Sequence, residues 1–166
     1  MILPIPNHRV CIVTGPQRSG TTIATKMLAS DWGWQYLTEE NYGVQDEQRF
    51  MSIVRNVGRV VIQAPAMTHM MTHMANVNVF VVWMMRPLAD ILRSQKRIGW
   101  ECYEAVERAK YAESDNDMPI AAIKYKQWKR DRSKVAHVEL SYDSLRSHPM
   151  FINKAKRRAF GPRQTA

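Results

Sequence analysis

The stretch at residues 13–22, V-T-G-P-Q-R-S-G-T-T, decides the fold of this 166-residue chain. The β-branched run at 10–13 is typical of a buried strand, and residues 21–29 have the apolar spacing of a helix. A strand, a tight loop and a helix N-terminus bring unpaired backbone N–H groups together, and the helix dipole there favours negative charge. We therefore expect an anion-binding loop at this point of the chain.

The two glycines of this loop, Gly15 and Gly20, have the G-x-x-x-x-G spacing of a P-loop. The lysine that normally follows the second glycine is replaced by Thr21, and a cation, Arg18, lies inside the loop instead. P-loop enzymes that use nucleoside triphosphates need that lysine, and they usually hold magnesium with an aspartate at a strand end. Neither later predicted strand, 60–63 or 77–85, ends in aspartate. The pattern favours a phosphate-binding loop that uses no metal.

Composition narrows the class of protein. Hydrophobic residues make up 45% of the chain and charged residues 23%, as in soluble globular proteins, and the length predicts one domain over residues 1–166. The apolar run at 77–85 is too short to cross a membrane, and residues 1–6 lack the features of a signal peptide. We expect a cytoplasmic protein with no membrane partner. The net charge of +9 indicates an anionic partner, either a phosphorylated small molecule or nucleic acid.

Strand and helix patterns alternate along the rest of the chain. Further strands are predicted at 34–37, 59–63, 76–85 and 138–140, and helices at 45–56, 66–75, 100–112 and 119–132, with another helix beginning at Pro87. This alternation predicts an α/β, three-layer P-loop-type fold with a central parallel sheet of about five strands and helices on both faces. The basic run at 124–134 is interpreted as a solvated helix face.

A second polar constellation follows the strand at 76–85. Arg86 lies at the end of that strand, and Asp90 and Ser94 share one face of the next helix at a spacing of i, i+4. We expect this face to lie opposite an apolar stripe formed by Leu88, Ile91 and Leu92. A guanidinium and a hydroxyl placed in this way can hold one phosphate between them.

A repeated M-T-H-M at 67–74 places His69 and His73 at i, i+4 on the predicted helix. Such a pair can bind zinc or copper, but no third ligand is nearby in the sequence, and methionine commonly fills protein cores. We interpret this segment as core and expect no metal site.

With these two phosphate-binding patterns in order along the chain, the sequence resembles the sulfotransferase family, P-loop enzymes that use 3'-phosphoadenosine-5'-phosphosulfate (PAPS). The family's loop, P-[KR]-S-G-T-[TS], is matched by R-S-G-T-T at 18–22, and its 3'-phosphate motif is matched by Arg86, Asp90 and Ser94. A late Y-x-x-L at 142–145 is also similar. The resemblance covers residues 9–94 and resumes at 137.

Several positions depart from the family pattern. Gln17 stands where the family has the proline before the loop cation, and Ile23 where many members have an adenine-stacking tryptophan. Gln63 replaces a lysine of the third strand, and Pro65 lies where cytosolic members keep a catalytic histidine. The basic loop near the family's C-terminus has only a loose counterpart at 154–163.

The resemblance implies transfer of a sulfuryl group from PAPS, without a metal, to a hydroxyl or amine acceptor. Arg18 would stabilise charge on the leaving oxygen, while Arg86 and Ser94 would hold the 3'-phosphate. The acceptor needs a base, for which the family's pattern favours Glu39 or Glu40 after the second strand, with His69 in reserve. The residues that would hold the 5'-phosphate are Gly15, Arg18, Ser19, Gly20, Thr21 and Thr22.

Two other functions stay open. A small-molecule P-loop kinase would need ATP and magnesium, against which the missing lysine and aspartate argue. A non-catalytic nucleotide- or RNA-binding module would explain both the positive charge and Gln63. The sequence indicates neither the acceptor, because acceptor contacts come from variable loops, nor the oligomeric state.

Overall fold

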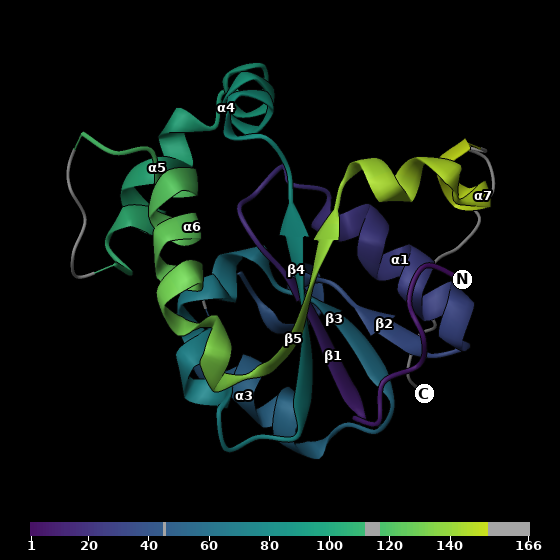
Figure 1. The fold of residues 1–166 in the computed structure, drawn as a ribbon. Coiled ribbons are helices and arrows are strands. Elements are labelled where there is room, and N and C mark those ends of the chain that lie inside the picture. The colour runs from purple at the N-terminus through teal and green to yellow at the C-terminus, as the bar shows by residue number, and fades with distance from the viewer. Residues whose placement is uncertain (45, 112–116, 153–166) are drawn as a thin grey trace.

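The computed structural model describes residues 1–44, 46–111 and 117–152, which build a sheet of five parallel strands (Figure 1). The strands are β1 (Val10–Thr14), β2 (Gln35–Leu37), β3 (Val60–Gln63), β4 (Val79–Met85) and β5 (Ala136–Ser141). Their order across the sheet is β2-β3-β1-β4-β5, so β1 lies between β3 and β4. The predicted α/β fold with a five-stranded parallel sheet is confirmed.

Helices lie near the predicted segments 21–29, 45–56, 100–112 and 119–132 and after Pro87, with different ends, whereas α2 was not predicted. The α-helices are α1 (Thr21–Trp32), α2 (Glu39–Tyr42), α3 (Glu47–Asn56), α4 (Leu88–Lys96), α5 (Glu101–Arg108), α6 (Ile120–Asp131) and α7 (Pro149–Ile152). Three 3-10 helices are η1 (Pro65–Met74), η2 (Arg132–Lys134) and η3 (Asp143–Ser147). Segment 66–75 is therefore a 3-10 helix, kinked at Met67. The segment at 154–163, the loose counterpart of the family's basic C-terminal loop, lies outside the described residues.

The two faces of the sheet carry separate cores, because side chains alternate along each strand. Val10, Ile12 and Trp83 lie in the core that includes residues of α3, η1 and α6. Cys11 and Val13 lie in the other, with residues of α1 and α7. Figure 1 shows α1 and α7 on one side of the sheet and α6 on the other. β1 is buried along its whole length, as expected for a central parallel strand covered by helices on both faces.

The carboxyl ends of the parallel strands meet at one edge of the sheet, where open α/β sheets bind their ligands. β1 leads there into the loop at 15–20, and β4 leads to Arg86 and α4. Because β1 and β4 are neighbours, with Thr14 beside Trp83, the two polar patterns of the sequence meet at this edge. No helix within the described part of the chain is both long enough and apolar enough to span a bilayer.

Candidate anion-binding site

The loop between β1 and α1 depends on left-handed backbone at three positions. Gly15 and Gly20 have φ values of 136° and 103°, which glycine adopts without a steric penalty. Arg18 has a φ of 73°, and it is the one non-glycine residue with positive φ among the described residues. Such a backbone costs about 1–3 kcal/mol and persists where the surroundings hold it. The contacts that hold this loop are therefore part of the site.

Close packing also requires glycine in the loop. A Cβ atom on Gly20 would lie 2.5 Å from Cδ2 of Tyr142, and one on Gly15 would lie 3.0 Å from the carbonyl oxygen of Met84. The loop therefore rests directly on the end of β4 and on Tyr142, which follows β5. Sequence reasoning noticed Tyr142 only through the family resemblance.

Three predicted ligands of the two phosphates come together beside this loop. Arg18 donates from Nε to Oγ of Ser94 at 3.1 Å, and Arg86 donates from Nη1 to the carbonyl oxygen of Arg18 at 2.8 Å. The Arg86 guanidinium also stacks on the ring of Tyr142, 4.5 Å from its centroid. Tyr125 of α6 fixes the backbone of Arg86, because its hydroxyl donates to the Arg86 carbonyl at 2.8 Å and accepts from the Arg86 amide at 3.0 Å.

The orientation of α4 corrects one prediction. Ser94 does not lie opposite the buried stripe: it is buried on the same face as Ile91 and Gln95, whereas Leu88 and Leu92 are only half-buried. Hydrogen bonds explain this orientation. Ser94 accepts from Arg18 of the loop, and Gln95 donates to the carbonyl of Gln17 at 3.2 Å. Contacts to the loop, rather than apolar periodicity, set the rotation of the helix.

Asp90, the acidic member of the same motif, lies further out. It is half-exposed and pairs with Arg93 at 3.4 Å.

A hollow of about 270 Å³ opens at this point, between the loop and β4. Its described lining contains two arginines and two threonines and no acidic side chain: Arg18, Gly20, Thr21, Thr22, Ile23, Arg86 and Tyr142. Cations, hydroxyls and the N-terminus of α1 thus face one small space. Such an arrangement favours a phosphate or a similar anion.

Glu39 lies elsewhere along the same edge of the sheet. Its Oε1 accepts a hydrogen bond of 2.8 Å from the backbone amide of Ala66, just after β3, and it does not line the hollow beside Arg18. Burial raises the pKa of Glu39 above its ordinary value, although the amide of Ala66 and the ammonium of Lys124 oppose the shift. A carboxyl with a raised pKa at a sheet edge has the chemistry expected of a proton acceptor.

The other two candidates for the base have different surroundings. Glu40 is exposed on α2. His69 is bound at Nε2 to Glu47 of α3 at 2.7 Å, and burial lowers its pKa although Glu47 opposes that shift. His73 is exposed, whereas His69 is partly buried. Neither Glu40 nor His69 lines the hollow beside Arg18.

The largest departure from the sequence-based predictions is Lys124. It belongs to the basic run at 124–134, yet it is completely buried, while Lys126 and Lys129 are exposed. Its ammonium donates to Oε1 of Gln17 at 2.6 Å, to Oε2 of Glu107 at 2.7 Å and to the carbonyl of residue 65 at 2.8 Å. A buried ammonium therefore lies between the loop, the start of η1 and α5.

Glu107 is the counter-charge of this lysine. Burial tends to raise the pKa of Glu107, but Lys124 and Lys110 outweigh burial and hold the pKa below its ordinary value, so the carboxyl is ionised. Lys110 reaches the same carboxyl at 3.1 Å. Helical spacing alone places Lys124 on the inner face of α6, three residues after Ala121 and four before Trp128. This inward position was not predicted from the sequence because Lys124 belongs to a run of basic residues, which are ordinarily exposed.

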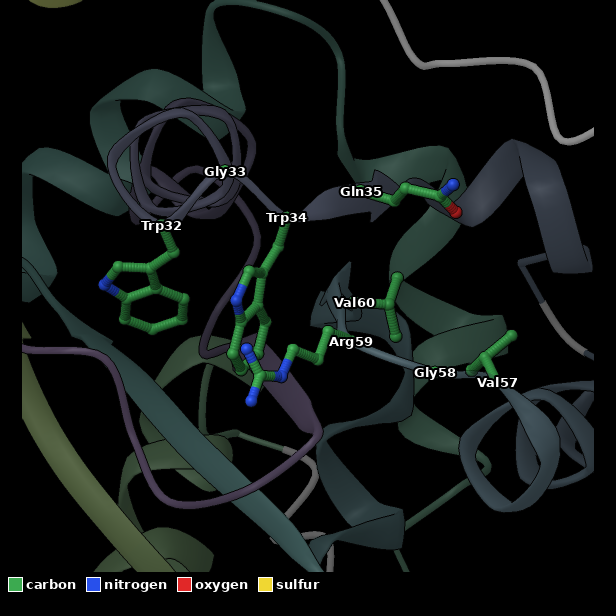
Figure 2. Close-up of a pocket in the computed structure, with 8 residues that line it drawn as sticks. All are labelled: Trp32, Gly33, Trp34, Gln35, Val57, Gly58, Arg59 and Val60. Atoms are coloured by element: carbon green, nitrogen blue, oxygen red, sulfur yellow. The ribbon is translucent and has the colours of Figure 1, made fainter.

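A larger hollow, of about 510 Å³, lies at the opposite, amino edge of the sheet (Figure 2). It is lined by the end of α1 and the beginnings of β2 and β3: Trp32, Gly33, Trp34, Gln35, Val57, Gly58, Arg59 and Val60. None of the predicted site residues lines it. Size alone therefore does not identify the site, and the chemistry is concentrated at the carboxyl edge.

Comparison with known proteins agrees with the fold. No protein-family model and no curated protein matches the chain. A solved shikimate kinase from Acinetobacter baumannii, in complex with shikimate, is similar at a TM-score of 0.55 and 14% identity, over 92% of this chain and 95% of that one. The structure of APE1195 is matched at a TM-score of 0.38 and 16% identity, over 78% and 97% of the two chains. The sheet, the loop and the first of these similarities define an α/β P-loop fold.

Proposed function

We propose that this protein binds a nucleotide phosphorylated at both the 5' and 3' positions, and that it transfers a sulfuryl group from PAPS to a small-molecule or polymer acceptor. The observation that carries the proposal is the cluster of Arg18, Arg86 and Ser94 beside the loop. A guanidinium has five N–H donors and always carries its charge, so two arginines can bind phosphate oxygens while keeping their contacts within the protein.

The proposed chemistry needs positively charged and N–H groups that stabilise negative charge on the leaving oxygen, rather than a metal ion. In sulfuryl transfer the bond from sulfur to the bridging oxygen breaks, and its electron pair stays on the nucleotide 5'-phosphate as the acceptor oxygen or nitrogen bonds to sulfur. Arg18 and the loop amides would stabilise that charge. The acceptor loses a proton in the same reaction, and Glu39, with its raised pKa, is the preferred base.

A small-molecule kinase is the second candidate, because the chain is similar in fold to a shikimate kinase. A kinase would use ATP with magnesium, whereas the loop has Thr21 in place of the usual lysine. The same site would serve either reaction, so the nucleotide decides between them.

A thermal-shift panel tests the proposal. Purified protein is heated with adenosine 3',5'-bisphosphate, PAPS, ATP with magnesium, or an RNA oligonucleotide, with EDTA in all samples except the ATP one. A ligand at 100 times its Kd stabilises by about 2.7 kcal/mol, or roughly 5–10 °C for a chain of this size. We expect that shift with the first two ligands. A shift with ATP and magnesium alone would favour the kinase, and one with RNA alone the binding module.

A further inference from the structure

The ammonium of Lys124 is completely buried and its three N–H groups all bond within the protein, so we assign it no direct contact with the proposed nucleotide. Burying a charge is costly unless it is paired and hydrogen-bonded. Here all three N–H groups of the ammonium have partners, on three separate segments of the chain: the loop, the first residue of η1 and α5. This internal charge therefore links the three segments to one another.

Gln17 is the part of the loop that Lys124 touches, and it is held at three points, one of which is a side-chain hydrogen bond with Glu107. Its side-chain oxygen accepts from Lys124 at 2.6 Å, and its backbone carbonyl accepts from Nε2 of Gln95 at 3.2 Å. The next carbonyl, that of Arg18, accepts from Arg86 at 2.8 Å. Two successive carbonyls of the loop are thus bound to donors outside the loop.

This bonding fixes the direction of the loop amides. In a trans peptide the C=O of one residue and the N–H of the next point in opposite directions within one plane. Because Gln95 and Arg86 hold the carbonyls of Gln17 and Arg18, the N–H groups of Arg18 and Ser19 are set. The Ser19 amide donates within the loop to the carbonyl of Pro16 at 3.0 Å, which closes the turn that presents the Arg18 amide. An amide oriented before the ligand arrives binds an anion without the cost of ordering it.

We propose that Lys124, acting through Gln17, is a positioning residue that holds the loop in its anion-binding conformation; the proposal rests on the anion-binding function proposed for the loop. We call Lys124, Gln17, Glu107 and Lys110 together the brace. Glu107 neutralises Lys124, and Lys110 links Glu107 to the carbonyl of Ala66 by donating to both, at 3.2 Å to the carbonyl. Through these contacts α5 and α6 hold a loop about 100 residues earlier in the chain.

Gln17→Met is the main test variant, since it keeps the length of the side chain and removes the amide that accepts from Lys124 and is hydrogen-bonded to Glu107. A second variant, Lys124→Met with Glu107→Gln, removes the ammonium without leaving an unpaired carboxylate buried. Lys129→Met is the matched control: the same substitution on the same helix at an exposed position.

The measurement is amide hydrogen exchange by NMR at Arg18 and Ser19 in the ligand-free protein, together with the Kd for adenosine 3',5'-bisphosphate. We expect Gln17→Met to speed exchange and to weaken binding, each about tenfold, and Lys129→Met to change neither. Adding Gln17→Met to the second variant should have little further effect, because both break one linkage.

Unchanged exchange at both amides in Gln17→Met would overturn the proposal, as would effects of the two variants that simply add. Exchange is measured without nucleotide, so it separates the two proposals. A wild-type protein that binds no nucleotide would refute the proposed function, whereas the brace is judged by exchange alone.

Discussion

Arg18 is the residue on which the proposed chemistry depends most. Its backbone is held in the left-handed region and its side chain reaches Ser94, so it faces the hollow from within the loop. In the proposed reaction the loop amides would hold the ground-state phosphate, whereas the guanidinium would meet charge that grows as the bond to sulfur breaks.

We therefore predict that Arg18→Ala lowers the rate of sulfuryl transfer by about 10²–10³, the effect of losing one donor to a developing oxyanion, while nucleotide affinity falls far less. Single-turnover transfer from saturating PAPS measures the first, and calorimetry the second. Wild-type transfer at saturation would make Arg18 a docking residue only.

Gly20 makes a second prediction at the scale of a residue, and Gly33 provides its matched control. Both have positive φ, but only at Gly20 would a Cβ meet a neighbour, whereas at Gly33 nothing lies within 4 Å. Gly33→Ala should lower the free energy of unfolding by about 1–2 kcal/mol, the cost of a left-handed backbone for alanine. Gly20→Ala should cost a further 1–3 kcal/mol or so, because of the contact with Tyr142. Urea denaturation compares them, and equal costs would contradict the close packing.

At the scale of elements, the start of α2 carries two adjacent carboxyls in unlike surroundings. Glu39 is held to the amide of Ala66 and has a raised pKa, whereas Glu40 is exposed. A carboxyl whose pKa is higher in the folded state binds its proton more tightly there. Its contribution to stability is therefore greatest below the unfolded pKa and is lost as the pH rises through the folded one.

Glu39→Gln keeps the acceptor for Ala66 and cannot ionise, so we predict that it gains stability over the wild type as the pH rises from 4 to 7. If Glu39 is the base, the same variant should lower transfer by about 10²–10⁴. Glu40→Gln is the control and should change neither quantity. Urea titrations at several pH values and transfer rates at pH 7 provide the data. A stability difference that stays flat with pH would remove the case for a raised pKa at Glu39.

The elements also show which parts of the fold and the site could be predicted from the sequence. The β1–loop–α1 unit was predictable because glycine spacing, a β-branched run and a helix pattern all agree over residues 10–29. The convergence of Arg86 and Ser94 on the loop followed from placing two strand ends side by side. The rotation of α4 was not predictable, because Ser94 and Gln95 turn inward to bind a loop 76–78 residues earlier in the chain.

At the scale of the molecule, Lys124 shows why contacts between distant segments could not be predicted from the sequence. A charge run is ordinarily solvated, and only the fold shows that one of its lysines meets Glu107 and the loop inside the protein. Among the described residues, Lys124 is thus a positive charge inside the structure, whereas Arg18 and Arg86 line the hollow at the carboxyl edge of the sheet.

The central claim is that the site recognises a second phosphate, at the 3' position of the nucleotide. Calorimetry in EDTA gives the ratio of the Kd for 5'-AMP to that for adenosine 3',5'-bisphosphate. We predict a ratio of roughly 10–100 for the wild type, since one charge-assisted contact contributes about 1.5–3 kcal/mol. Arg86→Ala should bring the ratio close to one. The ratio isolates the 3'-phosphate, because any loosening of the loop weakens both nucleotides.

Arg93→Ala is the control for this measurement: it removes an exposed arginine of α4 that pairs with Asp90, and it should keep the wild-type ratio. A wild-type protein that binds 5'-AMP and adenosine 3',5'-bisphosphate equally well would contradict the account.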